Sequence, residues 1–170
     1  MSSSAPPDQP RRGPGFWISA WLPVAIACGV IAVESTRFMG ADHTTGPLRG
    51  IWEWFFGVTT DARWEVTHHL IRKTGHFVGY GLVGLAWLRG WRKTFPSAAF
   101  LRHALLALAG TALIAGSDEF HQSFLPNRTA SRYDVLLDCT GAAVMMCGVW
   151  LIRRIRSPKS PAQASPECLQ

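Results

Sequence analysis

The chain of 170 residues is long enough for one domain and too short for two. Apolar residues make up 48% of it and charged residues 16%, whereas about a quarter of an ordinary soluble domain is charged. The formal net charge of +6 would suit a nucleic-acid-binding protein, but the Lys and Arg residues bracket apolar runs rather than forming one patch. That distribution is typical of a membrane protein, and it argues against nucleic acid as a partner.

Both ends of the chain are predicted to be tails. Residues 1–15 and 154–170 are rich in Ser and Pro and lack apolar periodicity, so we expect both to be disordered, with one folded domain at 16–153. This domain opens with an uncharged apolar run at 16–33, close to the ~20 residues that cross a ~30 Å hydrocarbon core as a helix. A signal peptide is the alternative. No small-residue cleavage site follows the run, so an uncleaved span is favoured.

Three shorter uncharged runs follow, at 77–88, 104–117 and 139–152. Each run alone could be a buried core helix rather than a membrane span. All three lack a polar face, and small residues in or beside them would allow close helix packing in lipid. We therefore predict an all-α fold, an integral membrane four-helix bundle. The glycines expected at close contacts are Gly75, Gly79, Gly81, Gly84, Gly110 and Gly116.

Each short run needs another turn or two to cross the membrane, and this must come from the polar sequence beside it. The added segments are 71–76, 118–122 and 134–138. Because successive spans alternate in direction, all three segments meet at one face of the membrane. The end of the first span, at 34–35, lies on the same face. The sequence thus predicts a cluster of polar side chains at one end of the bundle.

Seven side chains in or beside these segments are candidate site residues. Ionisable groups within a span cost roughly 2.5–3.5 kcal/mol each on insertion, and they normally face the bundle interior with partners. We expect the acidic members to meet the basic members across the bundle, either as a functional site or as a staple between helices. Asp134 could instead cap the last helix, together with Ser131. The candidates are Lys73, His76, Asp118, Glu119, Gln122, Arg128 and Asp138.

Several candidates are of ligand types that bind divalent metals, but no HExxH or similar spacing accompanies them. No nucleophile motif and no phosphate-binding glycine loop is present. We therefore predict neither a metal nor a cofactor, and the question of catalysis stays open. If a reaction occurs, Glu119 or Asp118 could serve as general base with His76 as partner.

The connection at 37–67 is rich in aromatic residues, including Trp52, Trp54 and Trp64. A structureless loop of this length is unusual in a compact domain. Either a helix lying in the membrane interface or a plain loop with an aromatic belt would account for it.

The basic residues predict the orientation. With the N-terminus in the cytoplasm, ten Lys and Arg residues lie inside and seven outside. The positive-inside rule thus places both termini in the cytoplasm and turns the polar cluster outward.

Two sequence blocks resemble the signature of the VanZ-like family. The first is KTGHFVGYGL at 73–82, and the second runs from SDEFHQSFLPNR at 117–128 to DVLLDCTG at 134–141. Ser35, after the first span, matches the usual serine of that family. Two departures are Asn127, where glycine is more usual, and Cys139 after Asp138. The resemblance covers about residues 16–153.

The resemblance implies a small multi-pass protein of the bacterial inner membrane. The namesake of the family accompanies a glycopeptide-resistance cluster and is associated with low-level teicoplanin resistance. Our first hypothesis is a cell-envelope protein whose polar pocket handles a lipid-linked wall precursor or a lipoglycopeptide. In it, the ligand head would meet Lys73 and Arg128 while the tail lies among the helices. The alternatives are an interaction module whose charges only staple helices, a metal-dependent membrane hydrolase and a proton-coupled transporter. The substrate, the oligomeric state and a role in teicoplanin resistance stay open.

Overall fold

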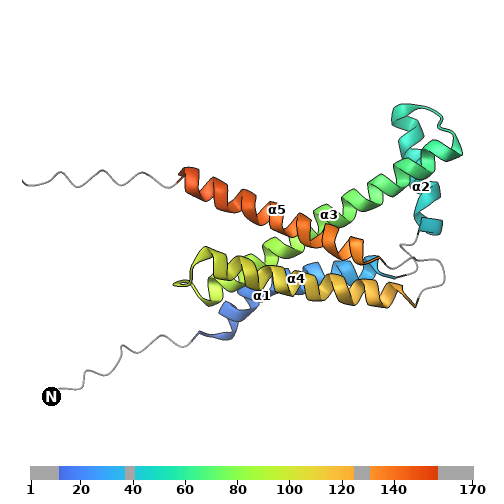
Figure 1. The fold of residues 1–170 in the computed structure, drawn as a ribbon. Coiled ribbons are helices and arrows are strands. Elements are labelled where there is room, and N and C mark those ends of the chain that lie inside the picture. Colours follow the sequence, from blue (N-terminus) through green and yellow to red (C-terminus); the bar gives the residue numbers. More distant parts are fainter. Residues whose placement is uncertain (1–11, 37–40, 125–130, 157–170) are drawn as a thin grey trace, which may run out of the picture.

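The computed structural model of the chain describes residues 12–36, 41–124 and 131–156, apart from the side chains of 41–43. These residues form five α-helices and no strand, so the all-α prediction is confirmed (Figure 1). The helices are α1 (Pro14–Glu34), α2 (Ala41–Phe56), α3 (Asp61–Thr94), α4 (Phe100–Gln122) and α5 (Arg132–Arg156).

Three of these helices, α1, α4 and α5, are long and apolar enough to cross a membrane. Helix α3 is the longest, with 34 residues, but polar and charged residues flank its apolar centre at 77–88. A crossing by α3 therefore stays a prediction, and the bundle of four spans is not established. What is established is a helical membrane protein with three span-like helices.

Helix α3 is the centre of the structure. It contacts each of the other four helices, α4 also contacts α1 and α5, and α2 contacts α3 alone. In Figure 1, α1, α3, α4 and α5 cross one another in one bundle, while α2 and the start of α3 project from one end of it. The N-terminal end of α1 and the C-terminal end of α5 lie at the opposite end.

The outside of the bundle is apolar and part of its interior is polar. Large side chains such as Leu113 (73% exposed) and Ile18 (60% exposed) point outward, whereas Asp138 and Thr111 are fully buried. Apolar contact with water is unfavourable, so a soluble domain would bury more of these side chains. Lipid removes that penalty, and this surface fits a hydrocarbon environment.

Glycines set the close approach of α3 and α5. A Cβ atom at Gly141 would lie 2.2 Å from the carbonyl oxygen of Phe77, and one at Gly84 would lie 2.6 Å from the Cβ atom of Ala142. Small residues at a helix contact let backbones approach, and packing in lipid depends on such approach. The prediction of close packing is wrong at two positions, because open space surrounds Gly75 and Gly116.

The connection at 37–67 is not a long loop within its described residues. It contains α2, as the interfacial-helix alternative predicts, and α3 begins at Asp61, about three turns before the expected segment at 71–76. Gly57, with a φ of 82°, lets the chain leave α2 in a left-handed conformation that other residues rarely adopt.

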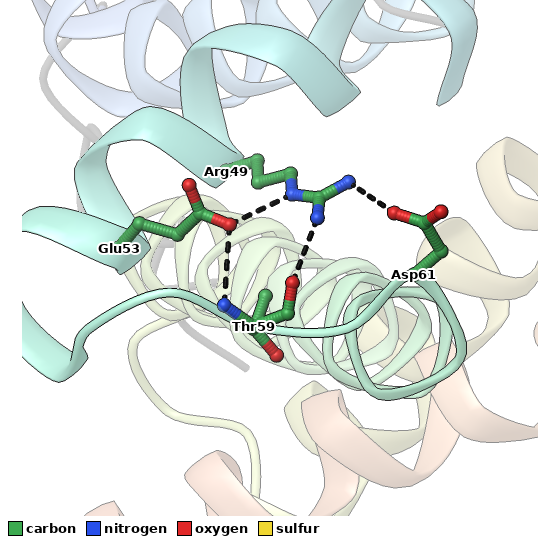
Figure 2. Close-up of polar contacts among 4 residues, drawn as sticks. All are labelled: Arg49, Glu53, Thr59 and Asp61. Atoms are coloured by element: carbon green, nitrogen blue, oxygen red, sulfur yellow. Dashed lines mark hydrogen bonds and ion pairs between the residues drawn. The ribbon is translucent and has the colours of Figure 1, made fainter.

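One arginine ties α2 to the start of α3 (Figure 2). Arg49 donates to the carboxylate of Glu53 at 2.9 Å, to the carboxylate of Asp61 at 2.7 Å and to the carbonyl oxygen of Thr59 at 2.8 Å. This hydrogen bonding holds the pKa of Glu53 below its ordinary value and raises that of Arg49. The network joins the end of α2 to the first residue of α3 and closes the hairpin.

Two boundaries also differ from the expected limits at 15 and 154. Helix α1 begins at Pro14, because proline is well suited to the first turn, where a backbone N–H has no partner. Helix α5 continues to Arg156, and its last turn is rich in basic residues, which interact favourably with the C-terminal end of the helix dipole.

Candidate functional site

Four helices bring polar side chains together at the end of the bundle from which α2 and α3 project. Four of the predicted site residues are buried there, three of them on α4 and one on α5. Their exposed fractions are 8% for Asp118, 7% for Glu119, 4% for Gln122 and 0% for Asp138. The alternation of helix direction thus produces the predicted cluster, in which three carboxylates are buried.

Helices α3 and α4 are joined inside the cluster by Tyr80 and Asp118. The Tyr80 hydroxyl donates to Oδ2 of Asp118 at 3.0 Å, and both side chains are buried. The other carboxylate oxygen of Asp118, Oδ1, is buried and has no partner among the described residues. One oxygen of Asp118 is therefore held in place, and the other keeps an unused capacity to accept a hydrogen bond.

Helices α3 and α5 are joined by His76 and Asp138. Nδ1 of His76 lies 3.5 Å from Oδ1 of Asp138, a separation that suits an ion pair better than a well-formed hydrogen bond. The His76 ring also stacks on Tyr80, with 6.1 Å between the centroids. His76 thus meets one of the acids as predicted, and together with Tyr80 it forms one wall of the cluster.

Lys73 has a different partner from those predicted. Its ammonium group pairs with the carboxylate of Asp134 rather than with Asp118, Glu119 or Asp138. Lys73 lies about two helical turns before Tyr80 on α3, so it reaches the first turn of α5 but not the deeper acids. Asp134 is therefore more than a helix cap.

The start of α5 is held by two other groups. Oε2 of Glu119 accepts the backbone N–H of Ser131 at 2.7 Å, and the Ser131 hydroxyl accepts the backbone N–H of Tyr133 at 3.2 Å. Ser131 thus acts as the predicted N-cap. Glu119 fastens the chain that enters α5 and does not meet a basic side chain among the described residues. Arg128, its other predicted partner, lies outside them.

Helix α1 reaches the cluster through Ser35. The Ser35 hydroxyl lies 3.0 Å from Nδ1 of His121, across the contact between α1 and α4. Ser35 is buried and His121 is exposed at the rim of the cluster. The cluster therefore includes side chains from α1, α3, α4 and α5.

A groove of about 460 Å³ opens from the cluster between α1 and α4. At its polar end lie Ser35, Asp118 and His121, and apolar side chains including Ile31 and Ile114 line the rest. The groove runs along two helices that are long and apolar enough to span a membrane.

Three further polar groups in the cluster are buried without hydrogen-bond partners among the described residues: Nδ1 of His76, Nε2 of Gln122 and both carboxylate oxygens of Asp138. Burying an unpaired polar group costs about 1–3 kcal/mol, and native structures keep few such groups without a reason. The cluster therefore has unused donors and acceptors as well as internal bonds.

The described residues contain no group of three or more His, Cys, Asp or Glu side chains that could hold a metal ion. His76 and Asp138 come together, while Glu119 is turned toward Ser131. His76 and Asp138 thus orient each other, and Glu119 is oriented by the backbone of Ser131.

Four site residues are absent from the predicted set: Ser35, Tyr80, His121 and Asp134. The sequence indicates Tyr80 through its spacing. It follows Lys73 by seven residues and His76 by four, so all three share one helix face. Asp134 lies in a sequence block that resembles a known family, and Ser35 matches the usual serine of that family. His121 lies in the same block as Asp134 and shares a helix face with Ser117, but its partner lies on another helix and could not be predicted.

The fold and the site define a class: a helical membrane protein with a buried cluster of carboxylates at one end of the bundle. The family described as VanZ/LLP1 matches residues 21–154, which is most of the chain. The chain belongs to this family, and the resemblance of its two sequence blocks is confirmed. No curated protein and no solved structure matches it.

Proposed function

We propose that the protein binds an amphiphilic cell-envelope ligand in the groove between α1 and α4. The ligand class is an acyl- or prenyl-bearing molecule with a hydroxyl-rich head, such as a lipid-linked wall precursor or a lipoglycopeptide. The observation that carries the proposal is the buried, unpartnered Oδ1 of Asp118 at the polar end of a groove with apolar walls.

The chemistry of the cluster selects the head of the ligand. Carboxylates accept hydrogen bonds, so Asp118 favours hydroxyl, amide or ammonium donors, and hydrogen bonds to a charged acceptor are the stronger kind. Lys73 is paired with Asp134, so it is a poorer anchor for the head than expected. The head therefore meets Asp118 and His121, and the tail follows Ile31 and Ile114 toward the centre of the bundle.

We further propose that α3 crosses the bacterial inner membrane with α1, α4 and α5, and that both termini are cytoplasmic. Arg12 donates to the carbonyl oxygen of Thr94, and Arg89 donates to that of Ser19, so basic side chains gather at the end of the bundle away from the carboxylates. The excess of basic residues at that end supports the orientation. The groove then opens toward the outer leaflet, where wall precursors and glycopeptides act.

The test is binding by protein reconstituted in lipid nanodiscs, with a fluorescent lipid-linked disaccharide-peptide and with teicoplanin as two separate ligands. Asp118→Asn should weaken binding by about tenfold or more, because it removes a charged acceptor. Ser117→Ala is the matched control: Ser117 also lines the groove, but its hydroxyl donates to Leu113 of its own helix.

Deacylated teicoplanin should bind more weakly than the intact molecule if the groove takes the tail. The proposal would be overturned if neither amphiphile bound, or if Asp118→Asn and Ser117→Ala had the same effect. If only the lipid-linked disaccharide-peptide or only teicoplanin binds, the ligand class is the wall precursors or the lipoglycopeptides, respectively. Whether a teicoplanin-resistance phenotype follows is tested separately, by susceptibility of cells with and without the gene.

A second candidate is an interaction module, favoured by the exposed aromatic tip of the α2–α3 hairpin. Trp54, Phe55 and Phe56 are 78%, 65% and 70% exposed, and Val58 beside them is 94% exposed. Exposed aromatic residues often mark contacts with a partner or a membrane surface. In this case the carboxylates only hold helices together. Asp118→Asn separates the two candidates, since under the first it lowers ligand binding at unchanged abundance and under the second it lowers abundance.

A further inference from the structure

A second pocket lies at the opposite end of the bundle from the carboxylate cluster. It has a volume of about 470 Å³ and is lined by the last turns of α3, the start of α4 and the end of α5. Its lining includes Arg89, Arg92, Lys93, Phe100, His103 and Arg153. We call it the basic pocket.

The lining of the basic pocket is strongly positive. Four Lys and Arg side chains line it, and no acidic side chain does so among the described residues. Arg89 and Lys93 donate to neutral oxygen atoms of Ser19, at 2.6 Å and 3.1 Å, and neither they nor Arg92 takes part in an ion pair in this part of the chain. Like charges held together repel, so an anion placed among them lowers the free energy.

One side of the basic pocket is apolar. It shares Phe100 and Arg153 with an adjoining hollow that is also lined by Trp150 and Arg154. The Arg154 guanidinium lies over the Trp150 ring, 5.5 Å from its centroid. Tryptophan and arginine at the end of a membrane helix are typical of headgroup depth. A ligand in the basic pocket would contact its Lys and Arg side chains and, beside them, the apolar surface of Phe100 and Trp150.

The first turn of α4 adds to this effect. The helix contains no acidic residue in its first turn, and Ala99 at its N-cap provides no side-chain acceptor for the backbone N–H groups. Phe100, the first residue of the helix, lines the pocket. The positive end of the helix dipole therefore reinforces the charge of the side chains.

We propose that the basic pocket binds the phosphate group of an anionic phospholipid headgroup. Basic pockets between membrane helices are suited to such headgroups, and the apolar side toward Trp150 suits the start of an acyl chain. This site is separate from the groove at Asp118 and does not depend on the function proposed for that groove. Free inorganic phosphate offers the same charge without the chain, and the test distinguishes the two sources.

The test uses full-length protein purified in detergent and exposed to mixed micelles of phosphatidylglycerol or phosphatidylcholine, with bound lipid counted by native mass spectrometry. We expect phosphatidylglycerol to be retained preferentially. Arg92→Gln combined with Arg153→Gln should reduce its retention by about tenfold. The matched control is Arg102→Gln combined with Arg156→Gln, which removes the same charge from the same end of the bundle but not from the pocket lining.

Three outcomes would overturn the proposal: no preference for the anionic lipid, equal loss in the control variant, or no loss in the pocket variant. Displacement of the lipid by millimolar inorganic phosphate would identify a free-phosphate site instead of a headgroup site. Because a pocket variant could fail to fold, wild-type protein provides a second measurement. Phenylglyoxal should modify Arg92 more slowly in phosphatidylglycerol vesicles than in phosphatidylcholine vesicles, and equal rates would contradict the proposal.

Discussion

The hydroxyl group of Tyr80 and the carboxylate of Asp118 join α3 to α4 with a buried hydrogen bond of 3.0 Å. Tyr80 is only 1% exposed, so its hydroxyl has no access to bulk water. This bond orients one Asp118 oxygen toward α3, while the other oxygen is buried without a partner among the described residues. The bond therefore couples the packing of the bundle to the geometry of the proposed binding site.

Tyr80→Phe removes the donor and leaves both oxygens of Asp118 buried without a partner among the described residues. We expect the variant to be destabilised by about 1–3 kcal/mol, the usual cost of an unsatisfied buried polar group. Thermal unfolding in detergent measures it. Tyr133→Phe is the control, because Tyr133 is 71% exposed. Equal melting temperatures for the two variants would show that the Tyr80 bond does not stabilise the bundle.

His76→Ala should destabilise the protein by about 3 kcal/mol, because Asp138 is fully buried and would lose the partner beside it. Adding Asp138→Asn should restore part of this loss, because the amide has no charge to bury. A double-mutant cycle of unfolding free energies checks the coupling. If the two effects simply add, His76 and Asp138 do not interact as the structure implies.

Gly141→Ala should disrupt the contact between α3 and α5, since its Cβ atom would lie 2.2 Å from a backbone oxygen. Backbone cannot move aside as a flexible side chain can, so we expect a loss of about 3 kcal/mol or more. Gly148→Ala on the same helix meets open space and serves as the control. Retention of a monodisperse species after mild heating measures both variants, and equal retention would contradict this packing.

Acid should loosen the α2–α3 hairpin. The pKa of Glu53 is lowered by its hydrogen bond with Arg49, so the folded hairpin binds protons more weakly than the open chain. Its contribution to stability is present above the ordinary pKa of a glutamate and is lost as the pH falls through the lowered value. Hydrogen exchange of 41–61 between pH 6 and about pH 3.5 measures the opening.

The change should be smaller in Glu53→Gln, whose side chain does not titrate. Glu65→Gln on the exposed surface of α3 should behave as the wild type. If Glu53→Gln keeps the full acid response, another group opens the hairpin.

The orientation is tested by cysteine labelling in intact cells, on a background without the four native cysteines. Ser123→Cys lies at the end of α4 beside the carboxylate cluster, and Ser97→Cys lies between α3 and α4 at the basic end. Both positions are exposed. We expect an impermeant maleimide to label Ser123→Cys in intact cells and Ser97→Cys only after lysis. The opposite pattern would place the carboxylates in the cytoplasm.

The sequence alone determined the helical class, the membrane character and the end of the bundle at which polar residues meet. These follow from local chemistry: uncharged runs need hydrocarbon, and alternating helix direction brings their polar flanks to one face. The sequence also indicated Asp118, Glu119, Gln122 and Asp138 as candidates, and the structure buries all four.

Only the tertiary structure decided which side chains are partners. Periodicity places Lys73 and His76 on one face of α3, but the rotation and height of α5 decide that Lys73 meets Asp134 while His76 meets Asp138. The same holds for Ser35 and His121, which are 86 residues apart. Helix positions of this kind depend on packing, as in the contact of Gly141 with Phe77 between α5 and α3. Packing depends on two surfaces at once, so it cannot be read from one segment of the sequence.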